Sequence, residues 1–105
     1  MRQFSNVQFR YDPEKNAKLL EDKNRKIGFD EIAAAMVEGK VLVVTDHFNK
    51  EQYPNQQIVY VLILDVVYKV PFVDENEDSI FLKTAYPSSK ARDFFFPKDK
   101  KKNKP

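Results

Sequence analysis

The 105-residue chain contains no cysteine and no tryptophan, and it has only one histidine and two glycines. The lack of cysteine excludes a disulfide scaffold, a zinc site built from thiolates and a cysteine nucleophile. A single histidine leaves few sets of side chains that would hold a metal ion. We therefore expect neither a bound metal nor a cofactor.

Long apolar stretches are also missing from the sequence. No run approaches the roughly 18 residues that a membrane-spanning helix needs, and the N-terminal sequence MRQFSNVQFR has no hydrophobic region of a signal peptide. We expect a soluble cytoplasmic protein without a membrane partner. A hydrophobic content of 42%, with 13% aromatic residues, is enough for the core of one domain, which we expect to span residues 1–96.

Charge is distributed unevenly along the chain. The net charge is +2, but the last nine residues, PKDKKKNKP, hold five lysines and one aspartate, which leaves a net charge of −2 on the rest. A slightly acidic body argues against a domain whose whole surface binds phosphate, although a local basic patch is compatible with it. The tail, residues 97–105, has no side chain suited to a core, so we expect it to be solvated and disordered. The alternative is an electrostatic arm for RNA, DNA or an acidic partner.

The first forty residues show the patterns of one short strand and two helices. Residues 7–10 alternate apolar with polar side chains, and Asp12 followed by Pro13 is typical of a helix start. The stretch that follows has few apolar anchors, which predicts a surface helix of about three turns. Apolar side chains then recur at helical spacing between Gly28 and Gly39, which predicts a second helix.

The spacing of apolar residues changes to that of strands after residue 40. Four strand-like runs follow, at residues 41–45, 57–64, 66–73 and 79–84. Both faces are apolar in residues 58–63, which predicts a central strand covered on each side, and Pro71 indicates an edge strand or a bulge. Turns are predicted at Leu64–Asp65 and at the acidic residues 74–78.

These patterns together predict an α+β fold with the element order βααββββα. A twisted antiparallel sheet would be packed by two N-terminal helices and a short C-terminal helix. The stretch at residues 79–96, SIFLKTAYPSSKARDFFF, joins an apolar strand to a basic, aromatic segment through Pro87. We expect the functional site near the end of this strand.

Four stretches of the chain carry a resemblance to a known family. They are FRYDPEKN, IGFDEI, DHFNKEQYPNQ and VYKVPFVDENEDSIFLKTAYPSSKA. In their order and spacing they resemble the BrnT toxins, small members of the RelE and ParE superfamily of bacterial toxin–antitoxin modules. The resemblance covers residues 7 to about 96.

The resemblance implies a RelE-like fold and a metal-independent ribonuclease that arrests translation by cutting free or ribosome-bound RNA. It also implies a cognate antitoxin of the ribbon-helix-helix type, through which alone the protein would contact DNA. Three features depart from the family pattern. Gln57 and Ser89 stand where arginines are common, and the Lys-His-Gly that precedes the second helix in many members has no counterpart in KNRKIGF, which is about two residues longer.

RNA cleavage without a metal needs a group that removes a proton from the 2′-hydroxyl, cations at the phosphate, and a proton donor for the leaving oxygen. The candidate cations are Lys83, Lys90 and Arg92. Lys83 shares a strand face with Phe81 and reaches either a cleft or the sheet edge. Lys90 and Arg92 follow the turn and would bind phosphate. The alternative for each is an ordinary solvated cation.

Histidine is the side chain best suited to exchange protons near neutral pH, so chemistry favours His47 as a general acid or base. It follows an apolar strand and enters a polar loop, so an exposed or structural role is the alternative. Asp46 would point to the opposite side of an extended strand, and no Asp–His pair is expected.

Four polar residues are candidate RNA contacts, namely Thr84, Ser88, Ser89 and Tyr53. The two serines are alternatively local caps of the backbone. Tyr53 is either a stacking platform for RNA or a contact for the antitoxin.

A second class of function is open to this sequence. The protein would be a non-enzymatic interaction protein that blocks a target, or a degenerate toxin retained for complex formation. The residues at positions 57 and 89 and the weak charge of the body favour this alternative. Retention or loss of RNA cleavage by the purified chain distinguishes the two.

Overall fold

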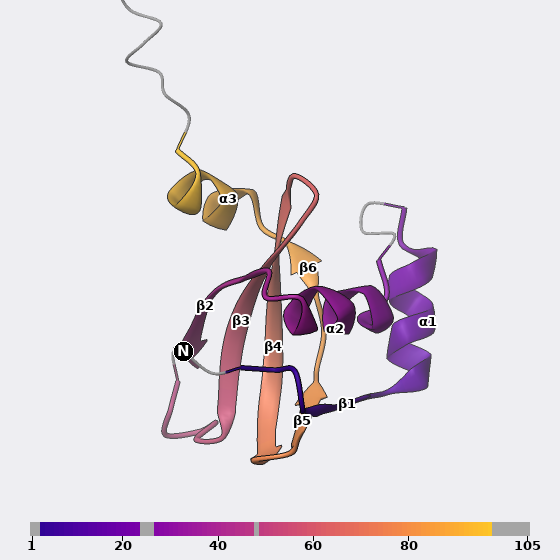
Figure 1. The fold of residues 1–105 in the computed structure, drawn as a ribbon, viewed down its shortest axis with the longest axis vertical. Helices are drawn as coiled ribbons and strands as arrows, with labels where there is room; N and C mark the ends of the chain where they lie inside the picture. The colour runs from indigo at the N-terminus through magenta and orange to yellow at the C-terminus, as the bar shows by residue number, and fades with distance from the viewer. Residues whose placement is uncertain (1–2, 24–26, 48, 98–105) are drawn as a thin grey trace, which may run out of the picture.

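The computed structural model describes residues 3–23, 27–47 and 49–97, which form an α+β fold with three helices and a mixed sheet (Figure 1). The elements, in chain order, are β1 (Gln8–Tyr11), α1 (Pro13–Glu21), α2 (Phe29–Val37), β2 (Val41–Asp46), β3 (Gln56–Ile63), β4 (Val66–Asn76), β5 (Ser79–Leu82), β6 (Tyr86–Pro87) and α3 (Ser89–Phe95). Each predicted helix and strand has a counterpart here, and β6 is additional. Residues 98–105 of the predicted tail lie outside the described residues.

Local hydrogen bonds explain where the first two helices begin. The Asp12 carboxylate accepts the backbone N–H of Glu14 at 3.0 Å and so caps α1. The residue before α2 is glycine, which offers no side-chain cap. Instead, the backbone N–H of Phe29 donates to Oδ1 of Asn16 in α1 at 2.8 Å. One helix therefore fixes the start of the next.

Gly39 follows α2 at a φ of 85°, a conformation that glycine adopts without steric cost.

The sheet has the strand order β1-β5-β4-β3-β2, and the short β6 pairs with β4. The prediction of a fully antiparallel sheet is wrong for one pair, because β1 runs parallel to β5. Two helices and three strands separate β1 from β5 along the chain, and residue alternation within a strand carries no information about its direction. The remaining pairs are antiparallel.

Pro71 lies in β4, at the middle of the sheet, and the prediction that it marks an edge strand or a bulge is wrong. Beside it the chain leaves the sheet between β5 and β6, and the backbone N–H of Lys83 donates to the Pro71 carbonyl at 2.9 Å. Because N and O of one strand residue point to the same side, the missing N–H of Pro71 faces this gap in the ladder. A central strand therefore tolerates the proline.

The turn predicted over the acidic residues 74–78 is shorter in the structure. Strand β4 continues to Asn76, so that only Glu77 and Asp78 form the tip. The backbone N–H of Asp78 donates to Oδ1 of Asn76 at 2.8 Å, which closes the turn with a side chain.

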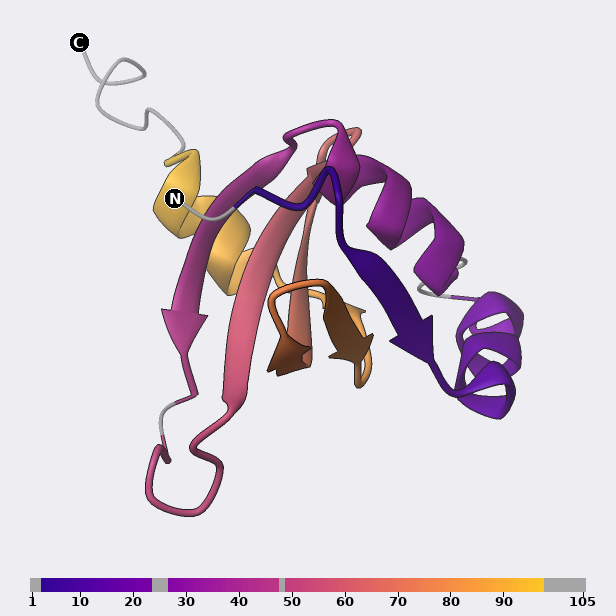
Figure 2. The same ribbon diagram turned by 60° about the horizontal axis from the view of Figure 1, so that its bottom comes forward.

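Helices cover the two faces of the sheet unequally. On the face toward α1 and α2, apolar side chains of the strands and helices form the core, including Phe29, Ile32, Met36, Val59, Val61, Val70, Phe72, Ile80 and Leu82. We call this the helical face, and the opposite side, which α3 covers at one end, the open face (Figure 2). No helix in the described part of the chain is long and apolar enough to cross a membrane.

Strand β3 is covered on both sides, as predicted for residues 58–63. Val59 and Val61 are fully buried on the helical face, and Tyr60 between them lies under Phe95 of α3 on the open face. The ring centroids of Tyr60 and Phe95 are 5.8 Å apart.

Candidate functional site

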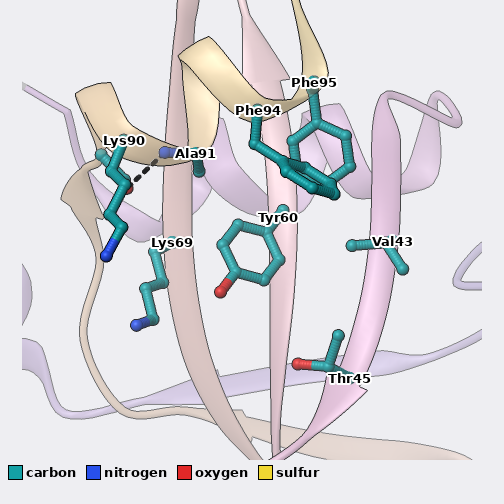
Figure 3. Close-up of a pocket in the computed structure, with 9 residues that line it drawn as sticks. Val43, Thr45, Tyr60, Lys69, Lys90, Ala91, Phe94 and Phe95 are labelled. Atoms are coloured by element: carbon teal, nitrogen blue, oxygen red, sulfur yellow. Dashed lines mark hydrogen bonds between the residues drawn. The ribbon is translucent and has the colours of Figure 1, made fainter.

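A pocket of about 500 Å³ lies between α3 and the open face (Figure 3). We call it the open-face pocket. Nine residues from three strands and the α3 segment line it, namely Val43, Thr45, Tyr60, Lys69, Ser88, Lys90, Ala91, Phe94 and Phe95.

Strand register builds the floor of the pocket. Val43 of β2 lies opposite Tyr60 of β3, which lies opposite Lys69 of β4, which in turn lies opposite Tyr86 of β6. Residues that are directly opposite one another share a face, so these four form one row across the open face. The Lys69 ammonium lies 6.0 Å from the centroid of the Tyr86 ring. An aromatic side chain thus flanks the lysine on each side.

Helix α3 forms the wall of the pocket and is attached to β4 at its N-terminal end and to the β3–β4 turn at its middle. The Ser88 hydroxyl caps it by accepting the backbone N–H of Ala91 at 3.1 Å, and the Ser88 N–H donates to the carbonyl of Val67 in β4 at 2.8 Å. Farther along, Arg92 donates from Nε to the Asp65 carbonyl at 3.0 Å and from its terminal nitrogen to the Asp65 carboxylate at 2.7 Å. No residue within α3 is buried, so these polar contacts and the Phe95 ring determine its position.

The pocket has two chemically different sides. In Figure 3 the ammonium groups of Lys69 and Lys90 lie on one side, while Phe94, Phe95 and Val43 lie on the other. The Tyr60 ring lies between them and directs its hydroxyl toward the side of Lys69. None of the nine lining residues carries a carboxylate. The pocket therefore suits a ligand that is anionic at one end and apolar at the other.

The structure brings two of the predicted site residues, Lys90 and Ser88, into this pocket. Lys83 is exposed and lies outside the lining of the pocket. Its backbone N–H donates to the carbonyl of Pro71, so the two residues lie opposite each other and share a face. Pro71 is two residues from Lys69 in β4, and Lys83 therefore lies on the open face. Thr84 is half-buried in the connection between β5 and β6 and does not line the pocket.

Arg92 and Ser89 lie outside the lining of the pocket. The Arg92 guanidinium is bonded to Asp65 and to the carbonyl of Phe96, at 3.3 Å, which assigns it to the positioning of α3. Ser89 is the exposed first residue of α3. That either residue contacts RNA stays a prediction.

His47 belongs to the loop that joins β2 to β3. The ring Nδ1 of His47 accepts the backbone N–H of Asn49 at 3.0 Å, and the backbone N–H of His47 donates to the Gln56 carbonyl at 3.1 Å. The ring packs against Tyr53, with 4.7 Å between centroids and a tilt of 47°. These contacts close the loop, and neither residue lines the open-face pocket. Asp46 pairs with Lys50 at 3.3 Å.

Sequence reasoning missed the two residues at the centre of the pocket, Tyr60 and Lys69. Two signals pointed to them. Lys69 is the only charged residue in the apolar run at 66–73. A two-residue turn at Leu64–Asp65 also pairs residues that are equidistant from it, and Tyr60 and Lys69 are such a pair.

Displaced pKa values mark two contacts elsewhere in the fold. The hydrogen bond from Ser79 lowers the pKa of Glu75, desolvation by burial acts in the opposite direction, and Arg10 lowers it further through an ion pair of 2.6 Å. The pKa of Tyr11 is raised, first by the hydrogen bond that its hydroxyl donates to Asp30 at 2.7 Å and then by burial. The Arg10–Glu75 ion pair joins β1 to β4, and the Tyr11–Asp30 bond joins β1 to α2.

Comparison with models of known families, with curated proteins and with solved structures finds no match to this chain. The family resemblance therefore has the support of the four sequence stretches alone. The functional argument depends on the geometry and charge of the open-face pocket.

Proposed function

We propose that this protein is the toxin of a type II toxin–antitoxin pair, a metal-independent endoribonuclease of the BrnT type with a RelE-like fold that arrests translation in the cytoplasm. The observation that carries the proposal is the open-face pocket. It combines two lysine ammonium groups, a tyrosine hydroxyl and aromatic rings, with no carboxylate among its lining residues. This combination suits a phosphate and the nucleoside attached to it.

In the proposed reaction, the RNA 2′-oxygen attacks the adjacent phosphorus and the bond from phosphorus to the 5′-oxygen breaks. The products are a 2′,3′-cyclic phosphate and a 5′-hydroxyl. Tyr60 orients the 2′-hydroxyl by a hydrogen bond, and a water molecule takes the proton of that hydroxyl as the bond to phosphorus forms. Lys69 stabilises the charge that develops on the phosphate, and Lys90 donates a proton to the leaving oxygen. Lys90 later regains a proton from water.

Lys83 extends the cationic surface beyond the pocket. Lys83 lies opposite Pro71, and Pro71 is two residues from Lys69 along β4. The spacing between strands and between residues then gives about 8 Å between the Cα atoms of Lys83 and Lys69. That spacing is close to the distance between neighbouring phosphates of an extended strand, so we assign Lys83 to the next phosphate. The assignment keeps Lys83 as a binding residue and places the chemistry at Lys69 and Lys90.

The two positions at which a family arginine is replaced fall outside the pocket. Gln57 pairs with Asp46 and Phe72 and so shares the helical face, and Ser89 is not among the lining residues. Neither substitution therefore removes a cation from the open-face pocket. This supports an active toxin over a degenerate one.

A non-enzymatic interaction protein is the second candidate. The observation that favours it is the apolar wall of the pocket, where the Phe94 side chain is 78% exposed. A ribbon-helix-helix antitoxin would cover this surface under either proposal, and a blocked target would use the same wall. RNA cleavage separates the two candidates.

The decisive experiment incubates the purified chain, freed from any partner, with free messenger RNA in EDTA and, separately, with ribosome-bound messenger RNA in a magnesium buffer that keeps the ribosomes intact. We expect cleavage with cyclic phosphate ends. Lys69→Ala and Lys90→Ala should each slow it about 100-fold or more, because each removes a preorganised charge from the transition state. Lys18→Ala, on the exposed surface of α1, is the matched control and should leave the rate unchanged. Absence of cleavage under both conditions, or equal rates in all variants, would refute the proposal.

A further inference from the structure

We propose that the apolar side of the open-face pocket is a slot for one unpaired nucleobase, so that the site selects single-stranded RNA. The inference rests on the proposed function and names the form of RNA that the site accepts. A nucleotide has the same polarity as the pocket, with an anionic phosphate at one end and a flat apolar base at the other.

The aromatic side chains define the slot. Phe95 packs against Tyr60, and Phe94 meets Phe95 nearly at right angles, with 5.2 Å between centroids and 88° between planes. Phe95 is thus held by its neighbours, while Phe94 leaves most of its surface to solvent. A large ring exposed at the mouth of a pocket is a binding surface for a second flat ring.

The opposite wall and the far end of the slot come from the edge strand β2. Val43 lies across from Tyr60, and Thr45 lies two residues farther along the same face. In Figure 3 Thr45 lies on the side of the pocket away from both lysines and directs its hydroxyl inward, toward the lysine side. A base above Tyr60 would therefore meet apolar surface on its faces and one hydroxyl at its edge, while its phosphate lies toward Lys69.

Base pairing would prevent this mode of binding. In a duplex each base is stacked and paired, and it must leave the helix before an aromatic side chain can stack on it. Two lysines alone would bind duplex and single strand through phosphate with little discrimination. Strand selectivity is therefore the property that separates a base slot from a simple cationic patch.

The test measures binding to a short RNA that carries 2-aminopurine and has 2′-O-methyl groups at every position, so that cleavage is blocked. We expect fluorescence quenching on binding, and at least tenfold weaker binding of the same strand in a duplex. Phe94→Ala should weaken binding of the single strand about tenfold, in line with the loss of one base–aromatic stack. Phe96→Ala removes a ring from the same end of the chain that does not line the pocket, and it should bind as the unaltered protein does.

A second variant tests the far end of the slot. Thr45→Val keeps the volume of the side chain and removes its hydroxyl, so it should change the preference among the four bases while overall affinity stays within about threefold. Both variants should keep the melting temperature of the unaltered protein, because Thr45 and Phe94 are exposed.

The outcomes separate the slot from the cleavage reaction. Quenching and strand selectivity without cleavage of ordinary RNA would support the slot and overturn the proposed ribonuclease. The slot would be overturned, and the ribonuclease retained, if cleavage is normal and the unaltered protein binds single strand and duplex equally well, with Phe94→Ala binding as the unaltered protein does. Failure of the unaltered protein to bind the single strand would also overturn the slot.

Discussion

The helical face and the open face belong to the same strands, yet around Tyr60 and Lys69 their side chains differ in burial and polarity. In β4, Val70 and Phe72 are fully buried beneath the helices, while Lys69 on the other face is only half-buried. In β3, Tyr60 alternates with two fully buried valines. The helical face thus contributes stability, and the open face presents chemical groups at positions that the buried face fixes.

The largest expected effect tests this division directly. Phe72→Ala should lower the free energy of unfolding by about 3–5 kcal/mol, because it leaves a cavity in a fully buried site. Phe94→Ala removes the same side chain from the open face and should change it by less than about 0.5 kcal/mol. Urea denaturation followed by circular dichroism measures both values. Equal losses would abolish the distinction between the faces.

A smaller effect is expected at the contact that joins α3 to the sheet. Arg92→Ala should lower the free energy of unfolding by no more than about 1 kcal/mol, because the pair with Asp65 is partly exposed. It should nevertheless speed hydrogen exchange of the α3 amides at least tenfold and leave β4 unchanged.

The control is the double-mutant cycle with Asp65→Ala. Asp65→Ala should speed exchange less than Arg92→Ala, because the backbone carbonyls of Asp65 and Phe96 still accept from Arg92, and the double variant should exchange as Arg92→Ala does. Additive increases in exchange would show that Arg92 positions α3 by another route.

The turn between β3 and β4 should give a gain in stability. Leu64 has a φ of 57°, which is unfavourable for a side chain with a Cβ, and it is 93% exposed. Leu64→Gly should raise the free energy of unfolding by about 0.5–1 kcal/mol, because it relieves this strain and loses almost no packing. Leu64→Ala keeps the strain and should be near neutral. A loss of stability with glycine would show that Leu64 packs in a way that its exposure does not indicate.

The smallest effect concerns pH. The pKa of Glu75 is lowered in the folded protein, so its contribution to stability is present above the pKa of the unfolded chain and is lost as the pH falls through the folded value. Glu75→Gln should therefore lower the melting temperature slightly at pH 7, and this difference should shrink as the pH falls below the ordinary carboxyl range. Glu77→Gln, at the exposed tip, is the control. A difference that grows toward acid pH would have the wrong sign.

The sequence predicts the elements well, because their local signals are strong. Asp12 caps α1, apolar spacing marks α2, and the strand bounds differ from the prediction by at most three residues. The parallel pair of β1 and β5 could not be predicted, since strand direction there depends on the path of the whole chain. Pro71 misled for a related reason, because the gap beside it forms only when β5 and β6 are in place.

The candidate site was predicted only in part. Residues 79–96 do supply Ser88 and Lys90 to the pocket, as well as its aromatic wall. The floor, however, comes from Tyr60 and Lys69, which a search for basic segments does not find because they stand alone among apolar residues. Arg92 is the opposite case, because it belongs to the basic segment but its guanidinium is bonded to Asp65 in the turn between β3 and β4.

The two-residue turn at Leu64–Asp65 has a consequence for how this protein can change over time. Its length sets the pairing of Tyr60 with Lys69, and its aspartate holds Arg92. Inserting or deleting one residue would shift the pairing by one position and move alternate side chains to the opposite face. The lysine would then lie in the core and the valines in solvent. Exposed turns usually tolerate changes in length, but descendants of this chain that retain the pocket must retain this turn at two residues.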